Sequence, residues 1–79
     1  MKNLNQIVIK LITQTLNVCE EQLDMNSRID ETQNWDSLTN MDILLEIEKF
    51  FSIKFELDEL QNLDSIKNIC ENLKNRDLN

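Results

Sequence analysis

Hydrophobic residues recur every three or four positions near the start of the chain. They fall at Leu4, Ile7, Val8, Leu11, Ile12 and Leu16. Because this spacing places them on one face of an α-helix, it predicts a helix over residues 4–16 with a single buried stripe. We expect Asn3 to cap its start, with Gln6 completing a capping box, and Asn17 to take the left-handed turn at its end.

A second amphipathic segment runs from Ser37 to Phe51, with Asp36 as its expected N-cap. At about 100° per residue, one arc is predicted to face the core and contains Asn40, Ile43, Leu44, Ile47, Phe50 and Phe51. The opposite arc carries Ser37, Leu38, Met41 and Leu45 together with the acids Asp42, Glu46 and Glu48.

This outward arc differs from an ordinary solvated helix face, which is polar throughout. Apolar side chains beside carboxylates are typical of a surface that contacts another protein. The alternative is that the preceding loop or another helix covers Leu38, Met41 and Leu45, since single exposed apolar residues are common.

The periodicity fails between residues 18 and 35, which predicts a long ordered loop between the first two helices. Its expected anchors on the bundle are Leu23, Met25, Ile29 and Trp35. The acids of this loop do not form a calcium site. An EF-hand register that starts at Asp24 would place Ile29 where Gly is required and Trp35 where the bidentate Glu belongs.

The last third of the chain predicts two more helices. Residues 52–57 read as a connector whose apolar residues plug the bundle, and Asp58 as the cap of a short helix with Leu60 and Leu63 facing inward. A final helix is expected to start at Asp64 or Ser65, with Ile66, Ile69, Cys70 and Leu73 on its buried stripe, and to end among residues 74–76 before a frayed tail, 77–79.

The predicted fold is therefore an all-α four-helix bundle, with three longer helices and one short helix, in a single domain over residues 1–79. A chain with no Gly and no Pro favours such a bundle over a sandwich or barrel. The net charge of -7 argues against nucleic acid and favours partners with basic surfaces. No apolar run is long enough to span a bilayer, so we expect a cytoplasmic monomer without membrane insertion.

The residue types exclude most catalytic and metal chemistry. The chain has no His, so it has no Ser/His or Cys/His pair and no metal site, and we interpret Cys19 and Cys70 as packing residues. Without Gly it has no phosphate-binding loop. No catalytic residue can be named, and an enzyme is not expected.

We interpret Ser37 instead as a residue that is itself modified. If Asp36 caps the helix, the Ser37 hydroxyl is free and points outward, and a phosphodiester there would meet the free N–H groups and the positive end of the helix dipole. The alternative is that Ser37 itself caps the helix and does nothing more.

The segment Trp35-Asp36-Ser37-Leu38, with the amphipathic run after it, resembles the acyl carrier protein family. The matching residues after Leu38 are Met41, Asp42, Leu44, Leu45, Glu46, Ile47, Glu48, Phe51, Ile53 and Phe55. The order of the predicted elements matches as well, so the resemblance covers nearly the whole chain.

The resemblance implies that Ser37 is the attachment point of 4'-phosphopantetheine, transferred from coenzyme A by a phosphopantetheinyl transferase. The thiol of that arm would carry acyl or aminoacyl groups as thioesters between enzymes of fatty-acid or specialised acyl biosynthesis. Basic patches on acyl-loading and acyl-using enzymes would meet the acids of the second helix, which are Asp36, Asp42, Glu46 and Glu48. Apolar pockets on the same partners would take Leu38, Met41 and Leu45.

The chain departs from the family pattern at three positions. Asn34 stands where many members have Gly, and Asn is the next best residue for a left-handed turn. Thr39 and Lys49 stand where the carriers of fatty acid synthesis usually have acids, which leaves a specialised pathway open. The alternative function is an unmodified acidic adaptor that binds a partner through its second helix.

Overall fold

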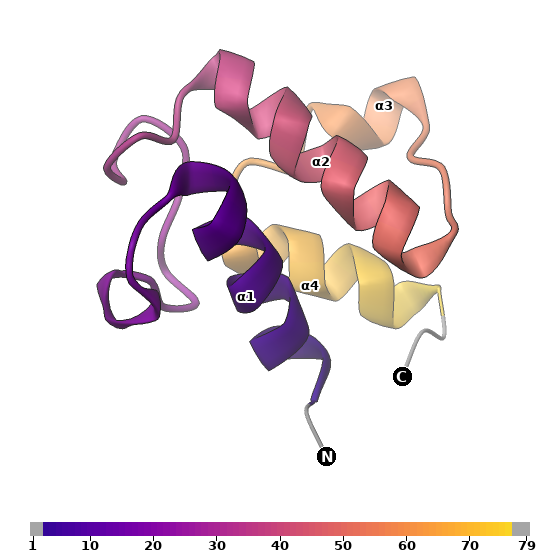
Figure 1. Cartoon of the computed structure of the whole chain (residues 1–79). Helices are drawn as coiled ribbons and strands as arrows, with labels where there is room; N and C mark the ends of the chain where they lie inside the picture. The colour runs from indigo at the N-terminus through magenta and orange to yellow at the C-terminus, as the bar shows by residue number, and fades with distance from the viewer. Residues whose placement is uncertain (1–2, 77–79) are drawn as a thin grey trace.

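The fold is that of a small helical bundle. The computed structural model describes residues 3–76, with helices α1 (Leu4–Leu16), α2 (Ser37–Phe51), α3 (Leu57–Leu60) and α4 (Ile66–Asn75) and a 3-10 turn, η1 (Glu20–Gln22). The helix α1 packs against both α2 and α4, and the short α3 lies at one edge of the molecule (Figure 1). The predicted all-α fold with three longer helices and one short helix is confirmed.

Both ends of α1 are capped by asparagines, as predicted. The Asn3 side chain accepts a hydrogen bond from the Gln6 N–H at 2.9 Å, and the Gln6 side chain accepts one from the Asn3 N–H at 3.4 Å. Asn17 takes the left-handed conformation, with φ 58°. Capping residues therefore define this helix in a chain that lacks glycine.

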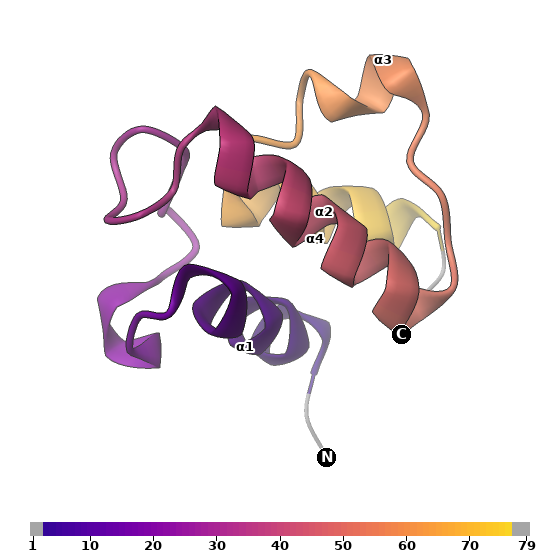
Figure 2. The same ribbon diagram turned by 45° about the horizontal axis from the view of Figure 1, so that its top comes forward.

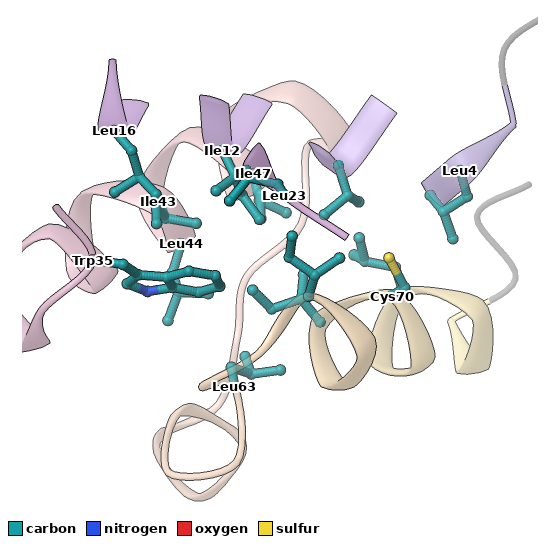
Figure 3. Packing of buried hydrophobic residues seen from close by; sticks show 14 of the residues in the cluster. Leu4, Ile12, Leu16, Leu23, Trp35, Ile43, Leu44, Ile47, Leu63 and Cys70 are labelled. Carbon is teal, nitrogen blue, oxygen red and sulfur yellow. The ribbon is translucent and has the colours of Figure 1, made fainter. Parts of the chain in front are cut away.

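A single hydrophobic core joins the three longer helices to the loop. Figure 3 shows Trp35, Ile43, Leu44 and Cys70 within this cluster. Burial raises the pKa of the Cys70 thiol to about 11, which makes this cysteine an inert packing residue, as expected. The same expectation for Cys19 is wrong. Cys19 is exposed because the chain turns onto the surface at η1, where the Cys19 N–H donates to the Gln22 side chain at 3.0 Å.

The long loop is ordered, because it is anchored by side chains and by backbone hydrogen bonds. Leu23 and Trp35 are buried, whereas Met25 and Ile29 pack against the core less completely. The loop is also tied to the start of α4: the Ile29 N–H donates to the Asp64 carbonyl at 2.8 Å, and the Ile66 N–H to the Ser27 carbonyl at 3.0 Å. The four predicted anchors are confirmed, but the pattern did not reveal η1.

Two burial predictions, one at the end of α2 and one in the segment after it, are wrong. Phe50 was expected in the core but is 57% exposed, because it lies at the end of α2 beside an open groove that Ile7 and Leu11 line. Its ring lies edge-on to that of Phe51, with the ring centroids 5.0 Å apart. Leu57 was expected to plug the bundle, but it is the first residue of α3 and is 83% exposed.

The cap of α3 is Glu56 rather than Asp58. The Glu56 N–H donates to the Glu59 carboxylate at 2.8 Å, and the same carboxylate binds Arg76 at 2.7 Å and Asn72 at 2.6 Å. These contacts with α4 set the position of α3 along the chain, and they cannot be read from local sequence. Figure 2 shows α3 lying away from α1, at the far side of α2.

Two further findings concern residues 3–76. None of the helices there has both the length and the apolar character needed to cross a membrane. Within the same range, no three His, Cys, Asp or Glu side chains gather where they could hold a metal ion. The predicted frayed tail lies outside the described residues.

Candidate functional site

Ser37 is the first residue of α2, and Asp36 caps this helix. The Asp36 carboxylate accepts a hydrogen bond from the Thr39 N–H at 2.9 Å. This N–H, together with the Thr39 hydroxyl, lowers the pKa of Asp36 below its usual 3.8. Ser37 is exposed, and its hydroxyl forms no hydrogen bond within the described part of the chain. The interpretation that Ser37 itself caps the helix is therefore wrong.

The turn before Ser37 is held in place from both sides. Asn34 takes the left-handed conformation expected of it, with φ 67°, and its side-chain amide donates to the Leu16 carbonyl at the end of α1, at 3.0 Å. The Trp35 carbonyl accepts from the Asp30 N–H at 2.7 Å. The turn that leads into Ser37 is thus tied to the end of α1 and to the preceding loop.

A buried polar pair behind the serine was missed by the sequence patterns. The Trp35 indole N–H donates to the Asn40 side-chain oxygen at 2.9 Å, and the Asn40 amide donates to the Leu63 carbonyl at 3.2 Å. This chain of hydrogen bonds joins the serine turn, α2 and the segment before α4. An asparagine on the predicted core arc was the available signal, because a buried amide needs partners.

Thr39 was also missed as a structural residue. Its hydroxyl accepts a hydrogen bond from the Asp36 N–H at 2.9 Å and lies 2.8 Å from the Asn34 carbonyl oxygen. Together with the Asp36 carboxylate it forms a reciprocal capping box, here made with threonine rather than the usual Glu or Gln. The signal was a hydroxyl residue three positions after an expected N-cap.

The outward face of α2 is uncovered. Leu38 is 79% exposed, Met41 47% and Leu45 49%, so neither the loop nor another helix covers them. Asp42 and Glu46 are exposed beside these residues. Apolar and acidic side chains therefore share one accessible surface below Ser37, and we call these five residues the outward face.

Glu48, also expected on this face, is less accessible than Asp42 and Glu46. It is half-buried, and its carboxylate accepts a hydrogen bond from the Phe55 N–H at 2.7 Å. Since this bond fixes the connector between α2 and α3, Glu48 has a structural role. On the exposed surface, the Lys49 Nζ lies 3.9 Å from the Glu46 Oε1, which makes a weak ion pair.

An apolar groove of about 510 Å³ runs between α2 and α3, next to the outward face. Its apolar lining consists of Met41, Leu44, Leu45, Phe55, Leu57 and Leu60. Met41 and Leu45 belong to both the groove and the outward face. The groove and the outward face therefore form one continuous surface that shares these two side chains.

The four serines of the chain differ sharply in their surroundings. The hydroxyl oxygens of Ser27 and Ser65 already accept hydrogen bonds, from the N–H groups of Asp24 and Asn68. Ser52 is exposed but lies at the C-terminal end of α2, where the helix dipole repels a phosphate. Ser37 combines an exposed hydroxyl with a helix N-terminus, so it is the serine that fits a phosphate ester.

Comparison with known proteins agrees with this geometry. Residues 6–73 match the family described as "Phosphopantetheine attachment site". The chain is 30% identical over 74 residues to an acyl carrier protein of Buchnera aphidicola subsp. Baizongia pistaciae, covering 94% of this chain and 95% of the relative. It is 29% identical to an acyl carrier protein of Rickettsia bellii, with 91% and 84% of the two chains covered.

These matches span most of the chain and include the whole serine-bearing helix. The chain therefore belongs to the phosphopantetheine-attachment family, and it is a carrier protein with covalently bound 4'-phosphopantetheine as its prosthetic group rather than an enzyme.

Proposed function

We propose that Ser37 is the residue that holds 4'-phosphopantetheine, and that the chain carries acyl groups on it between partner enzymes. In the attachment reaction the Ser37 oxygen forms a bond to the phosphorus of the pantetheine-bearing phosphate of coenzyme A. The pyrophosphate bond breaks, 3',5'-ADP leaves, and a base of the transferase takes the hydroxyl proton. When bound, the group supplies a terminal thiol that holds an acyl group as a thioester.

The observation that carries this proposal is the environment of the Ser37 hydroxyl. It is exposed and unbonded in the described structure because Asp36 and Thr39 perform the capping between them. As the first helical residue, Ser37 also has a backbone N–H without an intrahelical acceptor, beside the positive end of the α2 dipole. A phosphodiester at this position can accept hydrogen bonds from the free N–H groups of the helix N-terminus.

The outward face is the surface on which we place the partners. Asp42 and Glu46 would attract basic patches of the transferase and of the acyl-loading and acyl-using enzymes, since exposed charge mainly speeds and orients encounters. Leu38, Met41 and Leu45 would supply the buried contacts that hold the complex. Glu48 is left out of this surface because the connector already uses its carboxylate.

The pathway is a finer inference. Thr39 and Lys49 stand where the resemblance to carriers of fatty acid synthesis leads us to expect acids, so the acidic docking surface centres on Asp42 and Glu46. This surface fits a small set of dedicated partners, which favours a specialised acyl pathway over general fatty acid synthesis. Placement in the cytoplasm remains the prediction made from the sequence.

Intact mass spectrometry tests the attachment site. The purified chain is incubated with coenzyme A and a broad-specificity phosphopantetheinyl transferase, beside the variants Ser37→Ala and Ser52→Ala. We expect one added phosphopantetheine on the wild type and on Ser52→Ala, whose exposed serine is the matched control, and none on Ser37→Ala. An arm that persists in Ser37→Ala would place the attachment elsewhere. An unmodified wild type would instead favour an adaptor that binds without the arm.

A further inference from the structure

We propose that Thr39 is a positioning residue for the modification of Ser37, acting through a hydroxyl bridge across the serine-bearing turn. This inference rests on the proposed function, because it concerns the reactivity of Ser37. It assigns to Thr39 a role that differs from the partner contact expected of an acid at this position.

The Thr39 hydroxyl, two residues after Ser37, contacts groups of Asn34 and Asp36, which both precede the serine. It accepts a hydrogen bond from the Asp36 N–H at 2.9 Å. Its single proton faces three acceptors: the Asn34 carbonyl oxygen at 2.8 Å, an Asp36 carboxylate oxygen at 2.9 Å and, farther away, the Asp36 carbonyl oxygen at 3.3 Å. The turn is thereby bonded back onto the first turn of α2, and Ser37 lies inside the closed ring.

The bridge supports a backbone conformation that costs more for asparagine than for glycine. Asn34 has φ 67°, a left-handed geometry that asparagine tolerates better than most residues and that contacts to its side chain and carbonyl restrain. Two contacts supply that restraint: the Asn34 amide donates to the Leu16 carbonyl, and the Asn34 carbonyl faces the Thr39 hydroxyl. Glycine would need neither contact, so the departure at position 34 and the departure at position 39 are physically linked.

An acid at position 39 could form only half of this bridge. A carboxylate accepts a hydrogen bond from the Asp36 N–H but has no proton to donate to the Asn34 carbonyl. It would also place a second negative charge beside the Asp36 carboxylate. A hydroxyl residue is therefore the side chain that both caps α2 and closes the turn, leaving the Ser37 hydroxyl free for the incoming phosphate.

The test compares Thr39→Val, which keeps the shape and removes the hydroxyl, with Thr39→Ser, which restores it. Ile69→Val, in the buried part of α4, serves as a control for general loss of stability. Steady-state kinetics of the transferase with coenzyme A are measured on each full-length chain, at a temperature where circular dichroism shows all of them folded. Amide hydrogen exchange of Asp36 is measured by NMR on the unmodified chains.

We expect Thr39→Val to lower kcat about five- to tenfold, the worth of one hydrogen bond in the transition state. The KM of the transferase for the chain should stay within about twofold of the wild-type value, because the Thr39 hydroxyl stabilises the turn and does not lie on the docking surface. The Asp36 amide should exchange faster in Thr39→Val alone, and Thr39→Ser and Ile69→Val should resemble the wild type in both measurements.

Three results would overturn the positioning role: an unchanged kcat in Thr39→Val, a rise in KM alone, or an equal loss of kcat in Ile69→Val. The first would show that the bridge is dispensable, the second that Thr39 contacts the transferase, and the third that only stability matters. A wild-type chain that stays unmodified would overturn the proposed function itself, and it is recognised before any variant is compared.

Discussion

Asn40 shows how much of the serine site depends on one buried residue. Its side chain accepts from the Trp35 indole and donates to the Leu63 carbonyl, and it is only 8% exposed. A buried polar group stabilises the fold when it is paired. Its loss leaves the Trp35 N–H and the Leu63 carbonyl buried without a hydrogen-bond partner. The polar pair therefore makes the serine turn and the start of α4 dependent on each other.

Replacing Asn40 by leucine should destabilise the chain by about 2–4 kcal/mol, because the Trp35 N–H and the Leu63 carbonyl each lose a buried partner. Urea unfolding followed by circular dichroism measures this difference. Asn62→Leu, at an exposed position just before Leu63, is the control and should change stability by less than about 0.5 kcal/mol. A loss of similar size in both variants would contradict the buried hydrogen-bond account.

At the scale of the element, α2 is defined by its ends. Its N-terminus is capped by Asp36 and Thr39, while its C-terminus ends at Ser52, which has φ 56° in the left-handed region. The first arrangement serves the site, and the second strains a residue that has a side chain. Glycine should therefore raise the stability of the chain at a left-handed helix end and lower it where a side chain caps a helix.

Ser52→Gly should raise the free energy of unfolding by about 0.5–1 kcal/mol, since glycine adopts the left-handed cap without a steric penalty. Thermal and urea unfolding of the two chains provide the measurement. Ser65→Gly is the comparison at the other kind of helix end, where the hydroxyl caps α4, and it should lower stability. A Ser52→Gly chain that unfolds more easily than the wild type would refute the strain argument.

The short helix α3 depends on a carboxylate. The pKa of Glu59 is lowered below its usual 4.5, first by the Glu56 N–H and then by Asn72 and Arg76. A group whose native pKa is lowered contributes stability above its unfolded pKa and loses this contribution as the pH falls through the native pKa. The contacts between α3 and α4 should therefore weaken in acid and hold at neutral pH.

The stability difference between wild type and Glu59→Gln should accordingly be largest at neutral pH and shrink as the pH falls below about 4.5. Urea midpoints measured from pH 7 down to pH 3 follow this change. Glu71→Gln, at an exposed position on α4, should show no comparable trend. A difference between wild type and Glu59→Gln that grows in acid would reverse the sign required by the lowered pKa.

For the whole molecule, the helical fold was largely predictable from the sequence. The helix bounds of α1 and α2 and the caps Asn3, Asn17 and Asp36 followed from local patterns, because periodicity and capping act over three or four residues. The cap of α3, the exposure of Phe50 and the bond from Phe55 to Glu48 did not follow. Each depends on which distant segment covers or contacts the residue, which local sequence does not encode.

The net charge of -7 predicts that partner binding depends on salt. Association with the transferase should slow between 50 mM and 500 mM salt, since exposed charges are screened beyond about 10 Å at 0.1 M. Stopped-flow measurements should also show slower association for Asp42→Asn combined with Glu46→Gln. The same charge change at Glu20 and Glu71, away from the outward face, is the control. Equal slowing in both double variants would indicate that net charge alone matters.

The most direct test of the central claim is to locate the arm within the chain after modification. Fragmentation mass spectrometry of the proteolysed product can distinguish Ser37 from Ser27, Ser52 and Ser65. We predict that the added phosphopantetheine lies on the peptide that contains Trp35 and Ser37, and on that serine alone. The arm found on any other serine would contradict the account, because no other serine of the chain combines a free hydroxyl with a helix N-terminus.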